Sequence, residues 1–140
     1  MNEQEKLRIL ITDDSRLLRK KLREELERLN CDVTEAVNGK EAITQVLEQE
    51  FDGVILDIVM PVVGGIEALQ FLREVAPDLP VVMLSSMGTP QKLMQCLKMG
   101  AIDFINKPYT REQIIHTVER LKRLKAKRLD KVKAIVEGNV

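Results

Sequence analysis

The stretches RILIT (residues 8–12), GVILD (53–57) and VVMLS (81–85) are short, almost continuous runs of Val, Ile, Leu and Met. Runs of this length that are apolar at nearly every position are typical of parallel strands buried on both faces. Two less apolar segments, 32–36 and 102–106, also contain β-branched residues. Together these segments predict five strands of one parallel sheet.

Segments with helical periodicity lie between and after these strands. We expect helices at 16–29, 40–50, 66–75, 91–99 and 111–136, with Ser15 and Thr110 well placed to cap the first and the last of them. Regular alternation of strands and helices is the pattern of repeated βαβ units. The chain is therefore expected to form an α/β domain.

The composition indicates a single domain and gives no sign of nucleic-acid or membrane binding. The 140 residues are 44% hydrophobic, which is enough for one domain with its own core. The 22 basic and 22 acidic residues give a net charge of zero, so direct nucleic-acid or membrane binding is not expected. No apolar run approaches the roughly 18 residues of a membrane span, and we expect a cytoplasmic protein. Cys31 and Cys96 lie far apart without a CxxC motif and are expected to be buried thiols.

Polar residues stand where the predicted strands end. Asp13 and Asp14 follow the first strand, Asp57 ends the third, Ser85 ends the fourth and Lys107 follows the fifth. In an open parallel sheet, ligands bind outside the carboxyl ends of the strands. We therefore expect these side chains to converge on one edge of the sheet.

This set of side chains favours a magnesium site and a phosphoryl acceptor. Three carboxylates within a few Å repel one another unless a cation offsets their charge. Mg²⁺ prefers hard oxygen ligands and typically binds one or two carboxylates together with phosphate oxygens. A carboxylate such as Asp57, beside a metal ion and a lysine, can act as the nucleophile that forms an aspartyl phosphate.

Five separated pieces of the chain occur in a recognisable order: ILITDDS (9–15), NGKEA (38–42), VILDIVMP (54–61) with the following Gly65, VVMLSS (81–86) and GAIDFINKP (100–108). In this order they resemble the receiver domain of two-component response regulators, particularly the single-domain chemotaxis type. The resemblance covers about residues 6–122 and leaves 123–140 as a basic, helical C-terminal extension. It implies a flavodoxin-like, doubly wound sheet in the order 2-1-3-4-5 with five helices, the last of them extended.

The resemblance also implies a role for each residue of the pocket. Asp57 would be the phosphorylation site. Asp14 and Asp57 would bind Mg²⁺ directly, helped by the backbone carbonyl of Val59, and Asp13 would orient a metal-bound water. Lys107 would pair with the phosphoryl oxygens.

Further positions match residues of the family that respond to phosphorylation. Ser85 would hydrogen-bond the phosphoryl group after transfer, although Thr is commoner there. Phe104 matches the aromatic residue that turns inward on activation, and Pro108 matches a cis-proline. Val59 and Ser86 stand at positions thought to tune the lifetime of the phosphate, so that lifetime remains open.

Each feature alone has a simpler interpretation. Aspartates such as Asp13 often cap helices or form turns at strand ends. Lys107 and Pro108 could belong to an ordinary loop, Ser85 could simply end a strand, and Phe104 could fill the core. Their combination in one order favours the pocket.

We expect the protein to act in phosphorelay signalling, with a histidine kinase as donor. Phosphorylation would shift the population of a target-binding surface formed by 91–99, Phe104 and the last helix. The protein would catalyse its own phosphoryl transfer and slow dephosphorylation, without acting as an enzyme on another substrate. Two alternatives stay open: an interaction module of this fold that works without phosphate, and the receiver part of a larger regulator.

Two other classes fit poorly. A metal-dependent phosphatase needs a second acid shortly after the nucleophile, and Val59 cannot serve. A flavin or nucleotide binder of similar topology needs a Gly-rich loop after the first strand, where DDSRLL (13–18) stands instead.

The last predicted helix is longer than a crossover helix needs to be. Residues 111–140 carry nine Lys or Arg against four Asp or Glu. The basic residues from Arg120 to Lys133 could form only a solvated helix face. Alternatively, an apolar seam interrupted by Lys125 could make the segment a helical arm, a dimer contact or a connection to a further domain. That seam would consist of Val118, Leu121, Leu129, Val132 and Val136. A dimer through the surface of the fourth and fifth helices is also open.

Overall fold

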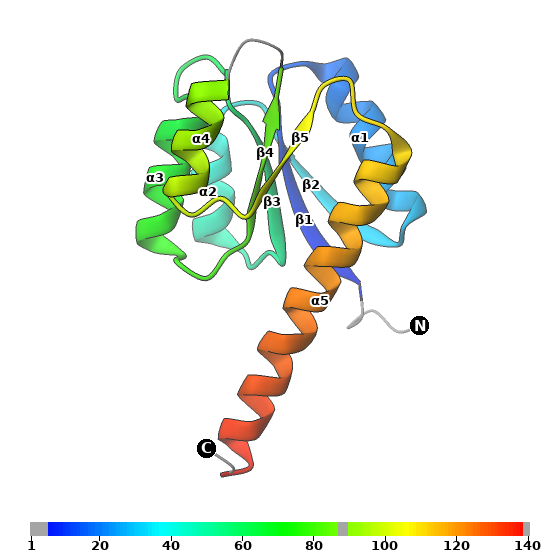
Figure 1. The fold of residues 1–140 in the computed structure, drawn as a ribbon, viewed down its shortest axis with the longest axis vertical. Helices are drawn as coiled ribbons and strands as arrows, with labels where there is room; N and C mark the ends of the chain where they lie inside the picture. Colours follow the sequence, from blue (N-terminus) through cyan, green and yellow to red (C-terminus); the bar gives the residue numbers. More distant parts are fainter. Residues whose placement is uncertain (1–5, 87–89, 139–140) are drawn as a thin grey trace.

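The computed structural model describes residues 6–86 and 90–138, in which strands and helices alternate along the chain (Figure 1). The strands are β1 (Leu7–Thr12), β2 (Cys31–Ala36), β3 (Gly53–Asp57), β4 (Val81–Ser85) and β5 (Asp103–Asn106). The helices are α1 (Arg16–Arg28), α2 (Gly39–Glu48), α3 (Gly65–Val75), α4 (Pro90–Lys98) and α5 (Arg111–Val136). All five predicted strands and all five predicted helices are present.

The five strands form one parallel sheet in the order β2-β1-β3-β4-β5. This confirms the doubly wound α/β fold. The chain passes from β1 outward to β2 and then back across β1 to β3, so strand order reverses between β1 and β3. The carboxyl ends of β1 and β3 therefore form the switch point at which ligands bind in folds of this kind.

Helices cover both faces of the sheet and bury one apolar cluster on each. Leu10 and Leu56 point into the cluster beneath α2, α3 and α4, whereas Ile11 and Ile55 point into the cluster beneath α1 and α5. Neighbouring strand residues face opposite sides because side chains alternate along a strand. Burial on both faces explains the continuous apolar runs, and β3 and β4 are buried at every residue.

Local hydrogen bonds set the helix starts. The Ser15 hydroxyl accepts from Leu18 N, and Thr110 forms a capping box with Gln113, as expected for N-caps. Helix α2 begins at Gly39, one residue before the predicted start, because the Asn38 side chain accepts from the backbone N–H of Glu41 at 2.9 Å. Both cysteines are buried, as predicted.

Helix α5 ends at Val136 as predicted, but part of its basic face is not solvated. Lys125 Nζ lies 3.0 Å from Asp52 Oδ2, and the Arg128 guanidinium lies 2.9 Å from Asp52 Oδ1. Asp52 is buried and also accepts from the backbone N–H of Arg8. These contacts tie α5 to the amino-terminal edge of the sheet, so the interpretation of the basic segment as only a solvated face is wrong at these two positions. Within the described residues, no helix is long and apolar enough to cross a bilayer.

An ion-pair cluster between α1 and β2 gives a pH-dependent contribution to stability. Glu35 contacts Arg19 at 3.0 Å and Arg23 at 2.7 Å. Burial acts to raise the pKa of Glu35, but the two guanidinium groups outweigh it and hold the pKa below its ordinary value. A lowered folded-state pKa means that the stabilisation is present above the unfolded-state pKa and is lost as pH falls through the folded-state pKa.

Glu35→Gln is therefore expected to lower the free energy of unfolding at pH 7 by less than about 1 kcal/mol, because the pair is partly exposed. The difference from the native chain should vanish in acid. Urea denaturation across the acidic range would measure it, with the exposed Glu24→Gln of α1 as control. A pH-independent difference would argue against an electrostatic origin.

Candidate functional site

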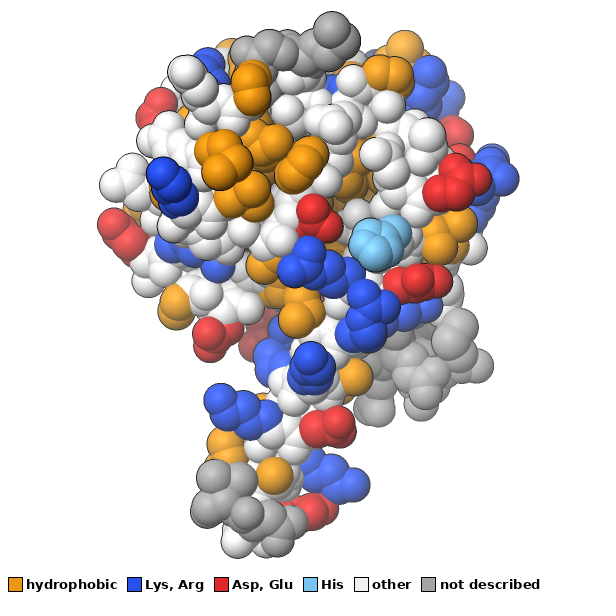
Figure 2. Space-filling model, in the orientation of Figure 1, with side chains coloured by type: hydrophobic (Ala, Val, Ile, Leu, Met, Phe, Trp, Pro, Cys, Tyr) orange, Lys and Arg blue, Asp and Glu red, His pale blue; other side chains and the backbone are white. Residues whose placement is uncertain are grey.

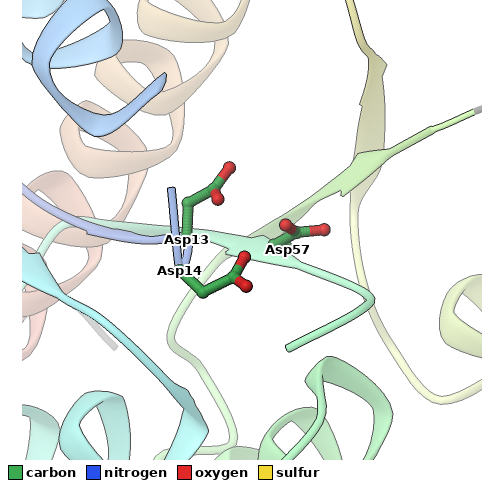
Figure 3. Close-up of side chains that lie close together, drawn as sticks. All are labelled: Asp13, Asp14 and Asp57. Atoms are coloured by element: carbon green, nitrogen blue, oxygen red, sulfur yellow. The ribbon is translucent and has the colours of Figure 1, made fainter. Parts of the chain in front are cut away.

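The carboxyl ends of β1 and β3 bring three carboxylates together (Figure 3). Asp13 and Asp14 follow β1, and Asp57 is the last residue of β3. One oxygen from each of the three lies within 4.8 Å of the others. Asp13 and Asp57 are buried, whereas Asp14 is exposed. The convergence of these aspartates predicted from the strand ends is present.

Lys107 reaches two of these carboxylates from the loop after β5. Its Nζ lies 2.7 Å from Asp57 Oδ2 and 2.8 Å from Asp13 Oδ2. The backbone N–H of Lys107 donates to the carbonyl of Ser85 at 2.7 Å, which links the end of β4 to the loop after β5. The contact with Asp13 was not anticipated from the sequence, which placed Lys107 only beside the phosphoryl group.

Backbone groups fix the second oxygen of each buried carboxylate. The N–H of Val59 donates to Asp57 Oδ1 at 3.2 Å, and the N–H of Ser15 donates to Asp13 Oδ1 at 2.9 Å. Each carboxylate is thus held by a backbone donor on one oxygen and by Lys107 on the other. This arrangement orients both groups before any ligand binds.

The electrostatics of the cluster raise the pKa of Asp57 above its ordinary value. Burial raises the pKa of Asp57, and the charge of Asp13 raises it further, so that the opposing contributions of Lys107 and the Val59 N–H do not restore the ordinary value. For Lys107, burial acts to lower the pKa, but its contacts with Asp13 and Asp57 outweigh burial and raise it. The ammonium therefore stays protonated, while the carboxylates lack full compensation.

The donor set fits a divalent cation. Three carboxylates and one ammonium carry a net charge of minus two when all are ionised. Hard carboxylate oxygens at a partly exposed edge are the ligands that Mg²⁺ favours. Asp13, Asp14 and Asp57 are the residues that could hold such an ion.

Gly65 allows helix α3 to begin directly against the end of β3. A Cβ at this position would overlap the carbonyl oxygen of Asp57 and lie 2.7 Å from the Cα of Ile58. The N–H of Gly65 donates to the Ile58 carbonyl at 2.9 Å, which closes the loop after Asp57. The absence of a side chain at residue 65 therefore sets the backbone position of the candidate acceptor.

The remaining predicted site residues lie on β4 and β5 or directly after β5. Ser85 is buried at the end of β4, next in sequence to Leu84, which is the strand partner of Asp57. Phe104 is 38% exposed on β5, so the alternative that it fills the core is wrong. The peptide bond between Lys107 and Pro108 is cis, as the family resemblance implied.

The model of the response regulator receiver domain matches residues 9–119. The chain belongs to this family. Receiver domains are phosphoacceptors of two-component signalling, and they typically bind Mg²⁺ at an acidic site. The acidic cluster of this receiver agrees with both properties.

Relatives of this receiver include proteins of different lengths. It is 31% identical over 115 residues to the chemotaxis protein CheY of Thermotoga maritima, covering 81% of this chain and 96% of that protein. It is 36% identical over 123 residues to the transcriptional regulatory protein ResD of Bacillus subtilis, covering 88% of this chain but only 51% of ResD. The receiver therefore spans about half the length of ResD.

Solved structures share the fold. The chemotaxis response regulator CheY4 of Vibrio cholerae superposes with a TM-score of 0.77 at 28% identity, covering 83% of this chain and 98% of that one. NtrX from Brucella abortus gives a TM-score of 0.83 at 28% identity, covering 90% of this chain and 29% of NtrX. Both agree with the predicted flavodoxin-like receiver fold.

Proposed function

We propose that this receiver accepts a phosphoryl group on Asp57 from a histidine kinase, in the presence of Mg²⁺, and that phosphorylation switches the binding of a protein target. The observation that carries the proposal is the position of Lys107 Nζ, 2.7 Å from Asp57 Oδ2, inside a cluster of three carboxylates. This arrangement pairs a nucleophile with a fixed positive charge.

In the proposed transfer, an Asp57 carboxylate oxygen forms a bond to phosphorus as the bond between phosphorus and the donor breaks. Asp14 and Asp57 would hold the metal directly, with the backbone carbonyl of Val59 as a further ligand, and Asp13 would orient a metal-bound water. When bound, Mg²⁺ neutralises charge on the transferring oxygens. Lys107, which contacts Asp57 Oδ2, would stabilise the same charge.

The proposed switch follows from the contacts of Lys107. New phosphoryl oxygens would attract the Lys107 ammonium and the Ser85 hydroxyl. Because the Lys107 N–H donates to the Ser85 carbonyl, the end of β4 and the loop after β5 would respond together. The half-exposed Phe104 of β5 would turn inward in the phosphorylated state, shifting the population of the surrounding surface.

The proposed target surface is apolar. Figure 2 shows a cluster of hydrophobic side chains over α4 and β5. These two elements carry the exposed apolar residues Met94 (55% exposed) and Phe104 (38% exposed). Exposed apolar patches of this kind mark sites of protein association. We place target binding on α4, β5 and the adjoining part of α5.

Labelling by acetyl phosphate tests the proposed acceptor. The native chain should gain one phosphoryl group in Mg²⁺, detected by intact mass, and should gain none in EDTA. Asp57→Asn should reduce labelling to background, because no carboxylate remains at the acceptor position. Asp52→Asn is the matched control, since Asp52 is also buried but lies at the opposite end of β3. Persistent labelling of Asp57→Asn would overturn the assignment.

A further inference from the structure

The buried face of α5 continues beyond the body of the domain. Its positions 118, 121, 125, 128, 132 and 135 are three or four residues apart and so lie on one face of the helix. Val118 and Leu121 are buried against the sheet, and Lys125 and Arg128 pair with Asp52 at the sheet edge. Beyond them the helix projects from the domain (Figure 1).

The projecting part of this face is apolar but exposed. We call Leu129, Val132, Ile135 and Val136 the tail seam; their exposed fractions are 54%, 51%, 56% and 79%. None of them belongs to either apolar cluster of the described core. A short amphipathic helix without tertiary contacts is only marginally stable in water. Contact between the tail seam and another apolar surface would therefore stabilise this end of α5.

A groove lies between this face and the base of the domain. Its volume is about 530 Å³, and Leu129 of α5 forms one wall. Apolar residues of the opposite wall come from the ends of α2 and α3 and from the loops that follow them: Val46, Phe51, Ala76, Pro77 and Leu79. The groove thus extends the tail seam into a concave site at the end of the sheet opposite Asp57.

The charged residues around the tail seam and the groove indicate which kind of partner fits them. Residues 120–133 carry eight Lys or Arg against Asp130 alone, and Figure 2 shows basic side chains crowded where α5 leaves the domain. By helical geometry Lys131 and Lys133 flank the tail seam on its two sides, and Asp130 lies on the far side of the helix. Lys133 also lies 4.0 Å from Glu137, an exposed pair that screens little of its charge. The charged side chains that line the groove are balanced, three basic and three acidic: Arg8, Lys125, Arg128, Glu50, Asp52 and Asp78.

We propose that the tail seam and groove bind an acidic amphipathic helix of another protein. Its apolar face would cover the tail seam, and its acidic flanks would meet the lysines on both sides, as in coiled coils with complementary flanking charges. A second copy of this chain would instead place lysines opposite lysines, which is repulsive. A bilayer is flat, whereas Leu129 of the tail seam lines a concave groove against the base of the domain.

The test uses the full chain and a synthetic helical probe. The probe is a peptide with Leu at its a and d positions and Glu at its e and g positions, measured by calorimetry without Mg²⁺ or phosphoryl donor, so that the result does not depend on phosphorylation. Binding is expected, and it should weaken as salt is raised. The same peptide with Lys in place of Glu should bind at least about tenfold more weakly.

Variants locate the binding surface. The double variant Val132→Ser, Ile135→Ser should bind the Glu peptide about tenfold or more weakly than the native chain, because apolar burial is lost. Ala134→Ser, on the opposite side of the helix, should have little effect. Loss of helicity in the Val132→Ser, Ile135→Ser variant would also weaken binding. The double variant Lys131→Glu, Lys133→Glu keeps the apolar seam, and it should bind the Lys peptide more tightly than the Glu peptide.

Three results would overturn the proposal. The first is equal affinity for the Glu and Lys peptides, or binding of neither. The second is a dimer in sedimentation that the Val132→Ser and Ile135→Ser pair dissociates, which would make a second copy the occupant. The third is binding of the chain to phosphatidylglycerol vesicles, if Ala134→Ser keeps that binding and Val132→Ser with Ile135→Ser abolishes it.

Discussion

Gly65→Ala is expected to lower the free energy of unfolding by about 2–3 kcal/mol and to reduce labelling of Asp57 by acetyl phosphate. The added Cβ would overlap the Asp57 carbonyl oxygen and crowd the Cα of Ile58. Both obstacles are backbone atoms, so relief requires movement of the chain that carries the acceptor. Chemical denaturation would measure the stability, and intact mass would measure the labelling.

Gly64→Ala provides the matched control. Gly64 has a φ of −74°, and the nearest atom to an added Cβ is the Ile58 carbonyl oxygen at 3.8 Å. The conformation is open to any residue, so the change in stability should stay within about 0.5 kcal/mol. Equal effects of the two substitutions would show that close approach at residue 65 does not constrain the loop after Asp57.

The strands were predictable because burial on both faces leaves a strong pattern. RILIT, GVILD and VVMLS are continuous apolar runs, and each corresponds to a strand in the centre of the sheet. The convergence of Asp13, Asp14 and Asp57 was predictable for a related reason: the carboxyl ends of parallel strands meet at one edge. Helix starts were less certain, because one side-chain hydrogen bond, as at Asn38, moves the start by a residue.

Contacts between distant side chains could not be predicted. Lys107 was expected beside Asp57, but its second contact, with Asp13, depends on how far the loop after β5 reaches across the sheet edge. Lys125 appeared only to interrupt an apolar seam, whereas Asp52 holds it at 3.0 Å. The available signal was an aspartate directly before a fully buried strand, which is costly to bury without a cation.

Lys107→Met is expected to lower the free energy of unfolding by about 3 kcal/mol in EDTA at pH 7. Removing one partner of a buried ion pair leaves uncompensated charge, and here it leaves two buried carboxylates, Asp13 and Asp57, facing each other. Mg²⁺ should recover part of the loss, because a divalent cation offsets the same carboxylates. Chemical denaturation with and without Mg²⁺ would measure both effects.

The pH dependence of this loss has a definite sign. Burial and the charge of Asp13 already raise the pKa of Asp57 with Lys107 present, and Lys107 opposes that rise. In Lys107→Met the folded state therefore binds a proton on Asp57 more readily than the unfolded state does. The penalty is full above the folded-state pKa of Asp57 and shrinks as pH falls through it. The native chain keeps its Lys107 pairs up to alkaline pH, since the pKa of Lys107 is raised.

Comparison with Lys125→Met distinguishes the loss of a charge from the loss of a packed side chain. The side chains of Lys125 and Lys107 are equally exposed, at 17%, so both variants lose similar packing. Without Lys125, Asp52 still has Arg128 at 2.9 Å and the N–H of Arg8 at 2.8 Å. The expected loss is about 1 kcal/mol, unaffected by Mg²⁺. Equal, magnesium-independent losses in the two variants would mean that the buried lysine stem, rather than the cluster of negative charge around Asp57, accounts for the stability. A larger loss at Lys107 that Mg²⁺ reverses would tie the ammonium and the cation to the same carboxylates, as the proposed phosphoryl transfer requires.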